Sequence, residues 1–324
     1  MKKNSNHVNL FITLGMMIIT ACSTPKLADY AAQTNLSKKV KYDHSNHKVN
    51  GDGRGYTIRA SQLSPFPKRI ALVSYFGTDP GSTEKGQNSR STYCMTKEGI
   101  KVLSNQFYAT SIGPLKDAFR KNNMELLTPD EFLKTEDQKK YYSNFSVEHT
   151  SLNNLGAGIM KGLTNAGSWG TGMSVKESAD GYSIIDIKND YFSSNAKQNL
   201  NGSQDSKMLT GVGADLCKAL GVDAVVVMYI SVASHKKNYS LQTASLYMLG
   251  PNMVMESTGK EKGFFYSKGV FYCGTRLWFK KPLLINQNPK KIAEDQLKSD
   301  NNKAVENISL ALVQKMEEYF KDGK

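Results

Sequence analysis

The sequence has few of the residues from which catalytic and metal sites are most often built. Its 324 residues include five histidines, four cysteines and two tryptophans. No cysteine or histidine set has the ligand spacing of a zinc site. His44 and His47 are three positions apart, but no helical apolar stripe surrounds them and no third ligand is placed nearby. We therefore expect no cofactor and no bound metal.

The sequence also lacks an apolar run of transmembrane length at its start. Val8–Ile19 is mostly apolar, but a membrane-spanning helix needs about 20 such residues. The run follows a polar stretch that carries Lys2 and Lys3. A basic start, a short apolar run and small residues before a cleavage site are typical of a secretory signal. Residues 1–21 are therefore predicted to be a signal peptide.

The end of this run carries a more specific pattern. Ile18-Ile19-Thr20-Ala21-Cys22 resembles the lipobox of bacterial lipoproteins. This resemblance implies that Cys22 is lipidated and becomes the N-terminus, which anchors the chain to a membrane. Ser23 stands where aspartate retains enterobacterial lipoproteins in the inner membrane, so the resemblance implies the outer membrane. No acidic run follows Cys22, so we expect the body to face the periplasm.

Acidic residues are fewer than basic ones, at 29 against 42, which gives a formal charge of +13. Loss of residues 1–21 removes two lysines and no acids, so the charge falls to +11. The lysines lie in distant pairs rather than in one basic patch. A solvated basic surface is the simplest interpretation, and a face for lipid head groups or cell-wall polymer is the alternative. Nucleic acid is not an expected partner outside the cytoplasm.

Three cysteines remain if Cys22 is lipidated, so at most one disulfide forms within the chain. Cys217 falls on the expected buried face of a helix, where a free thiol behaves as a small hydrophobic group. By elimination, Cys94 and Cys273 are the predicted disulfide pair.

Composition divides the mature chain into a linker and one domain. Residues 22–67 are rich in Ser, Asn, Lys, Gly and Asp without sustained periodicity, which predicts a flexible linker. Residues 68–324 are predicted to form a single α/β domain. Within it, 141–204 is rich in Gly, Ser and Asn and is interpreted as a long, partly mobile insertion; the alternative is a segment that contacts a membrane or a partner. The polar loop 77–91 is a second candidate contact surface.

The first part of the domain predicts strand, helix, strand, helix. Residues 68–76 are predicted to form a strand, because Ile70–Val73 are a near-continuous apolar run, as expected for a strand covered on both faces. A helix over 111–123 and a short strand over 124–127 follow. Thr128-Pro129-Asp130-Glu131 has the pattern of a capping box with proline in the first turn, so another helix begins there and reaches about residue 139.

The second part predicts a helix over 205–220 that ends at Gly221 and leads directly into a central strand over 222–230. Further strands follow over 239–279, with an aromatic hairpin around Ser267-Lys268-Gly269. A final helix covers 303–320. The predicted fold class is α/β (α+β), a mixed sheet with helices packed on it.

Two stretches resemble a group of envelope proteins. They are KRIALVSYF … LKDAFRKNNMELLTPDEFL and ADLCKALGVDAVVVMYISV, in which 123–133 and 220–227 carry the likeness. The group includes the amino-terminal domain of the Tol-system β-propeller protein, the curli-secretion lipoprotein and lipoprotein activators of peptidoglycan synthases. The chain departs from it in the 141–204 insertion, in the aromatic region, and in Asn123 where glycine is usual. The resemblance transfers no functional residue.

These features together favour a non-enzymatic outer-membrane lipoprotein that binds an envelope protein in an assembly or scaffold role. One alternative is a subunit of an oligomeric secretion pore, by analogy with the curli lipoprotein. Another is an enzyme acting on the cell wall, which would require paired carboxylates or a nucleophile beside a base. His149 and His235 have no evident partner for such chemistry.

Overall fold

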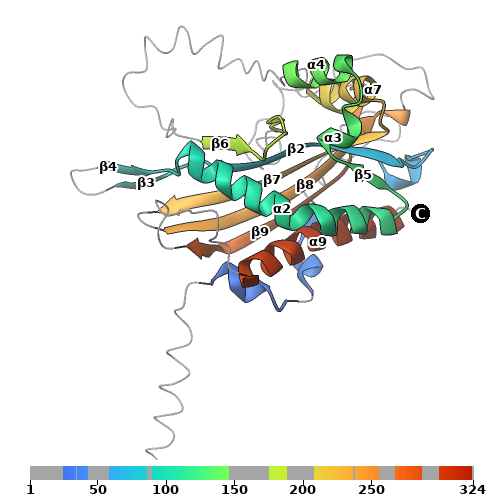
Figure 1. Cartoon of the computed structure of the whole chain (residues 1–324). Helices are drawn as coiled ribbons and strands as arrows, with labels where there is room; N and C mark the ends of the chain where they lie inside the picture. The colour runs from blue at the N-terminus through green and yellow to red at the C-terminus, as the bar shows by residue number, and fades with distance from the viewer. Residues whose placement is uncertain are drawn as a thin grey trace, which may run out of the picture.

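A computed structural model describes residues 25–33, 35–42, 58–85, 90–145, 175–187, 208–235, 238–254, 267–286 and 299–322. They form a mixed sheet with helices on both faces (Figure 1). The strands are β1 (Lys41–Tyr42), β2 (Arg69–Asp79), β3 (Ser82–Lys85), β4 (Arg90–Tyr93), β5 (Glu125–Leu127), β6 (Val175–Ser178), β7 (Ala224–His235), β8 (Asn238–Pro251) and β9 (Gly269–Asn286). The helices are η1 (Leu27–Tyr30), η2 (Leu36–Lys39), η3 (Ala60–Gln62), α2 (Lys97–Lys121), α3 (Pro129–Phe132), α4 (Glu136–Asn144), η5 (Thr210–Asp215), α7 (Leu216–Leu220) and α9 (Ser299–Asp322).

The main sheet has the order β1-β9-β8-β7-β2-β5, and β6 pairs with the far end of β2. Strand β2 runs parallel to β5 and β7, whereas β7, β8, β9 and β1 follow one another antiparallel. The parallel pairs are separated by helices, as right-handed crossovers require. The fold class predicted from the sequence, a mixed sheet with packed helices, is confirmed.

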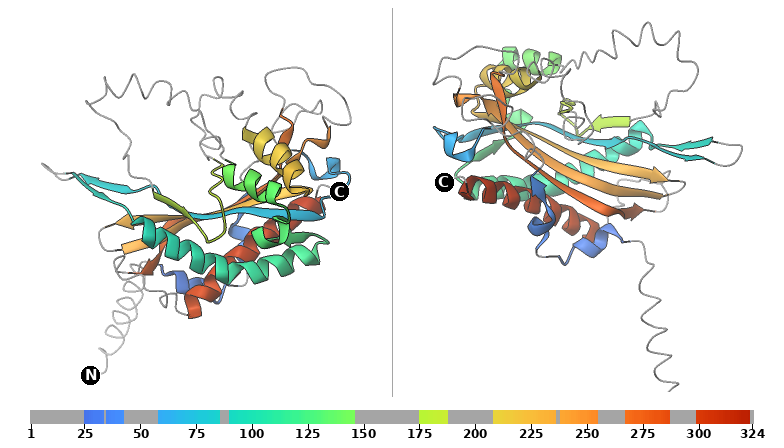
Figure 2. Two further views of the ribbon diagram at one scale, coloured as in Figure 1. Left: turned by 45° about the horizontal axis from the view of Figure 1, so that its top comes forward. Right: turned by 180° about the vertical axis from the view of Figure 1, so that it is seen from behind.

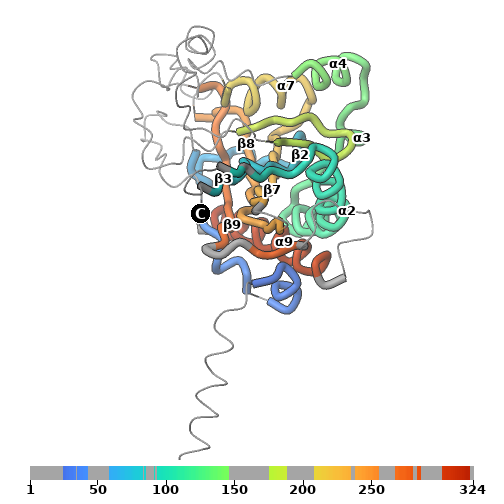
Figure 3. The backbone as a smooth tube through the Cα atoms, turned by 90° about the vertical axis from the view of Figure 1, so that its left-hand side faces the viewer, coloured from blue at the N-terminus to red at the C-terminus, as the bar shows by residue number. Residues whose placement is uncertain are grey.

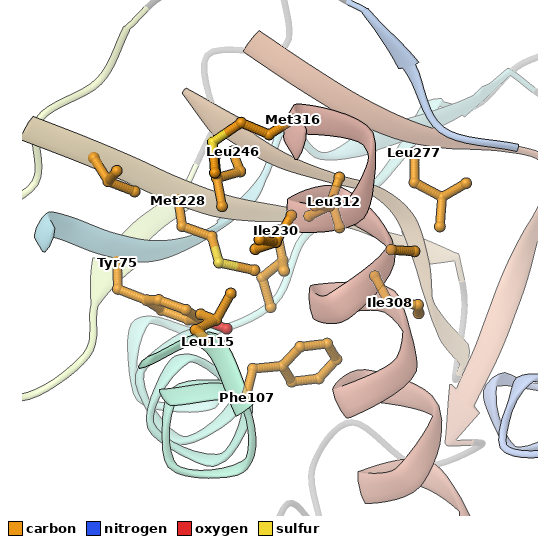
Figure 4. Packing of buried hydrophobic residues seen from close by; sticks show 14 of the residues in the cluster. Tyr75, Phe107, Leu115, Met228, Ile230, Leu246, Leu277, Ile308, Leu312 and Met316 are labelled. Atoms are coloured by element: carbon orange, nitrogen blue, oxygen red, sulfur yellow. The ribbon is translucent and has the colours of Figure 1, made fainter. Parts of the chain in front are cut away.

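Two cores hold the helices to the sheet. On one face, α2 and α9 pack on β2, β7, β8 and β9, and Figure 4 shows Phe107, Met228 and Leu312 pointing toward one another there. On the other face, α3, α4, η5 and α7 cover a smaller core that includes Val73, Val227 and Leu216. The two helical layers lie on opposite sides of the sheet in Figure 2. Burial on both faces explains the continuous apolar runs of β2 and β7.

Several helix ends form as the sequence predicts. Asn123 and Gly221 have positive φ values of 59° and 68° and end α2 and α7. Glu131 reaches back to the Thr128 backbone N–H at 2.8 Å, which completes the capping box. The helix that begins there is shorter than predicted, because the chain leaves it at Leu133 and starts α4 with a second cap at Thr135.

Helix α2 begins fourteen positions before the predicted start, at Lys97 rather than 111, and contains Pro114. The sequence favours a start near 111, because Pro114 would then fall in the first turn, where proline is tolerated, whereas proline is costly in a helix interior. Burial of Ile100, Leu103 and other side chains against the sheet compensates for that cost.

The linker predicted over 22–67 is wrong for its described residues. Residues 25–33 and 35–42, named here the N-terminal segment, pack on α9 and β9, with Leu27 and Leu36 fully buried. Pro25 O accepts a hydrogen bond from Leu284 N at 2.9 Å, and β1 pairs with β9. These contacts are made by isolated apolar residues in a mostly polar stretch and not by a periodic apolar pattern. The composition of the stretch therefore gives no sign that it is folded.

The aromatic hairpin predicted around 267–269 is described only in its second arm, residues 270–272, which lies in β9. Gly269 already belongs to β9 and pairs with Pro251 of β8, so the two long strands pair with each other. Residues 264–266 lie outside the described residues. Part of the 141–204 insertion belongs to the sheet, because β6 pairs with β2 and Ile185 is fully buried after it.

Candidate functional site

A groove lies between α4 and η5, on the sheet face that α2 and α9 do not cover. Its volume is about 530 Å³, within the range of small ligand sites. We name it the α4–η5 groove. Its lining residues are Asp137, Lys140, Tyr141, Asn144, Phe145, Gly211 and Asp215. These residues come from two helices far apart in the sequence, so the groove exists only in the folded chain.

Helix α4 is held in place by its buried side. The Tyr142 hydroxyl donates to Val73 O at 2.7 Å and accepts from Ser183 N at 2.9 Å. Gln138 Nε2 donates to Leu220 O at 3.1 Å, which ties α4 to the end of α7. Because Tyr142 points to the sheet, the neighbouring Tyr141 side chain is left 40% exposed at the groove.

The other wall of the groove is a π-helical turn, a conformation that is rare and often found at functional sites. Gly213 sets how closely it packs on the sheet. A methyl group on Gly213 would lie 2.9 Å from Gly250 O and 3.0 Å from Gly269 Cα. Only glycine therefore lets η5 approach the ends of β8 and β9 this closely. Lys268 N donates to Thr210 Oγ1 at 3.1 Å and secures the same contact.

The groove is suited to recognition. The Tyr141 and Phe145 rings lie 6.0 Å apart between centroids and offer an apolar surface. Burial and then the negative charge of Asp215 raise the pKa of Tyr141, so its hydroxyl stays protonated at neutral pH and can donate a hydrogen bond. Two carboxylates and one lysine line the groove. This set fits a partner segment that brings an apolar side chain together with cationic or amide donors.

The structure does not bring Cys94 and Cys273 together, so the predicted disulfide is wrong. Neither forms a disulfide. Cys94 follows β4 and its thiol donates to Asp79 O at 3.7 Å, beside the end of β2. Cys273 lies in β9, which β8 and β7 separate from β2. Three strand spacings amount to about 14 Å, whereas a disulfide requires Cα atoms within about 7 Å.

None of the three described cysteines has the environment of a reactive thiol. Burial raises the pKa of Cys217 and Cys273, which are both enclosed in the cores. Burial and the charge of Asp79 raise the pKa of Cys94. A protonated thiol is a weak nucleophile. Cys22, the predicted lipidation site, lies outside the described residues.

The loop predicted over 77–91 as a contact surface is a projecting hairpin, β3 and β4, next to the end of β2 (Figure 1). Sequence reasoning did not identify the residue that fixes its base. The Asp79 carboxylate is fully buried and accepts from Gly81 N at 2.8 Å, Met95 N at 2.9 Å and the Ser234 hydroxyl at 2.5 Å. The turn sequence Asp79-Pro80-Gly81 is the feature of the sequence that could have pointed to Asp79.

Among the described residues, no three histidine, cysteine or acidic side chains are grouped as a metal site would require. Within the same part of the chain, no helix has the length and apolar character needed to span a membrane.

Comparison with known proteins gives no relative: no protein-family model, curated protein or solved structure matches the chain.

Proposed function

We propose that this chain is an outer-membrane lipoprotein, anchored through Cys22, whose body binds an envelope protein in the periplasm and performs no chemistry. The lipobox-like Ile18–Cys22 supports the anchor. The resemblance of 123–133 and 220–227 to envelope lipoproteins supports the setting. The α4–η5 groove is the proposed contact site for the partner.

The observation that carries this proposal is the position of the groove. The N-terminal segment joins the core on the α2 and α9 side of the sheet, whereas α4 and α7 belong to the core on the opposite side. Figures 1 and 3 show the N-terminal segment and α4 at opposite sides of the body. An anchor at Cys22 would therefore direct the groove away from the membrane, toward partners in the periplasm.

The contents of the groove fit a protein partner. Aromatic side chains in partly enclosed pockets carry much of the binding energy at protein interfaces. Tyr141 is such a side chain, with Phe145 beside it and Asp137 and Asp215 around it. A scaffold role follows from an anchored body that presents this groove.

Crosslinking in cells tests the proposal. A photo-crosslinking amino acid replaces Tyr141 in one variant and Phe66 in a control, because Phe66 is 36% exposed on the α9 side. We expect a protein adduct from position 141 and none of the same mass from position 66. The same adduct at both positions, or none at 141, would contradict the groove as the contact site.

The pore alternative has weaker support in the described chain. A transmembrane β-strand needs about 9–11 residues with alternating character. The projecting hairpin pairs four residues in each arm, Ser82–Lys85 with Arg90–Tyr93. If the detergent-extracted protein had the mass of a ring of several copies, the pore would be favoured.

A further inference from the structure

The N-terminal segment leaves almost no chain between the proposed lipid and the folded body. Cys22 precedes Pro25, the first described residue, by three positions. Pro25 O bonds to Leu284 N at 2.9 Å, and Leu27 behind it is fully buried between η1 and α9. Three extended residues span at most about 10 Å. The body therefore has the membrane surface within reach at this side.

The surface presented there is basic. Residues 22–42 contain four lysines and one aspartate. Lys26, Lys38 and Lys41 are exposed, and they lie before η1, in η2 and in β1 rather than along a single turn. The Asp29 carboxylate accepts a hydrogen bond from Lys26 N, three residues before it, at 2.8 Å. Lys39 lies over the Tyr30 ring at 5.1 Å, so it is directed partly onto the body.

We propose that the N-terminal segment is a docking surface for an anionic phospholipid bilayer, and that Lys26, Lys38 and Lys41 contact its head groups. The proposal rests on the proposed lipid anchor at Cys22. A lysine near an anionic leaflet strengthens association by about fivefold. The anchor holds the body close to the membrane, and the lysines fix its orientation. The N-terminal segment then faces the membrane and the α4–η5 groove faces away from it.

The test places one fluorophore on each side of the body. Lys38→Cys labels the proposed membrane side, and Lys218→Cys, an exposed lysine of α7, labels the far side. Cys94→Ala in both variants removes the half-buried native thiol, while Cys217 and Cys273 are buried. The lipidated proteins are reconstituted into vesicles that contain a head-group quencher, with either phosphatidylglycerol or only phosphatidylcholine as the main lipid.

On phosphatidylglycerol vesicles we expect the label at position 38 to be quenched several-fold more than the label at 218. Replacing Lys26 and Lys41 by glutamine should reduce that difference, whereas glutamine at Lys134 and Lys139 of the α4 side should not. Equal quenching at both positions, or the same difference on phosphatidylcholine, would overturn the docking surface while the protein still floats with vesicles. A protein that is not acylated and does not float would overturn the anchor as well.

Discussion

The Glu131 carboxyl makes the stability of the first α/β unit sensitive to acid. Burial alone would raise its pKa, but hydrogen bonds from Lys116 and Thr128, with the charge of Lys116, lower it to about 2. A carboxyl whose pKa is lower in the folded state stabilises the fold above its unfolded value. That contribution is lost as the pH falls from about 4.5 to about 2.

Glu131→Gln keeps a capping side chain but removes this titration. We expect it to lower the free energy of unfolding by about 1 kcal/mol or less at neutral pH, because the ion pair is partly exposed to solvent. The variant and the natural chain should converge near pH 2. Denaturant unfolding across this pH range measures the effect, and Glu136→Gln, in an exposed pair with Lys139, is the control. A constant offset between variant and natural chain would contradict the assignment.

Gly213 decides how closely η5 approaches the sheet. A methyl group there would lie 2.9 Å from a backbone oxygen that belongs to a paired strand and cannot move freely. Gly213→Ala is expected to destabilise the chain by about 1–3 kcal/mol. It should also weaken crosslinking from the photo-crosslinking amino acid at position 141, because the groove wall must shift.

Gly113→Ala is the matched control. Gly113 lies in α2, and apart from its chain neighbours and the helix's own backbone no atom lies within 4 Å of the added methyl group. Alanine gains about 0.5–1 kcal/mol of helix propensity, but its methyl group meets the ring of the following Pro114, so we expect little net change in stability. Thermal unfolding of both variants gives the comparison. A large loss of stability in both variants would show that the described packing of α2 is wrong.

At the scale of elements, the N-terminal segment is part of the fold. Leu27 and Leu36 are buried in the same core as α9. Leu27→Ala should lower the free energy of unfolding by about 2–5 kcal/mol, the usual cost of deleting a buried leucine side chain. Lys38→Ala, at an exposed position of η2, should change it by less than about 0.5 kcal/mol. No loss of stability in Leu27→Ala would restore the interpretation of this segment as a linker.

Elements with local chemistry could be predicted from the sequence, and elements stabilised only by tertiary contacts could not. Thr128, Glu131 and Gly221 act through their own turn, so their pattern is visible in the chain. The N-terminal segment has short 3₁₀ turns with one buried leucine each, which no periodicity marks. The start of α2 could not be predicted because Pro114 is tolerated only in a first turn and so favours a start near 111, whereas packing on the sheet carries the helix through it.

At the scale of the whole molecule, the fold class follows from apolar runs and helix caps, whereas the candidate site does not. The α4–η5 groove joins Tyr141 to Asp215, and nothing in the spacing of these residues marks them as neighbours. The predicted disulfide is wrong for the same reason. Elimination paired Cys94 with Cys273, but strand order places them three strand spacings apart.

The two opposite sides of the molecule carry different features. One side carries the N-terminal segment and its exposed lysines, and the other carries the groove. The proposed anchor at Cys22, three positions before Pro25, would turn this asymmetry into an orientation on the membrane. Without the anchor, neither the basic surface nor the groove has a defined direction.

The most direct test of the account is fractionation of cells that produce the natural chain or Cys22→Ser, with mass spectrometry of the mature N-terminus. The account predicts that the natural chain sediments with outer membranes and begins at an acylated Cys22. It predicts that the Cys22→Ser chain lacks the lipid and is released from the membrane fraction. An unmodified Cys22 in the natural chain, with both chains equally membrane-bound, would contradict it.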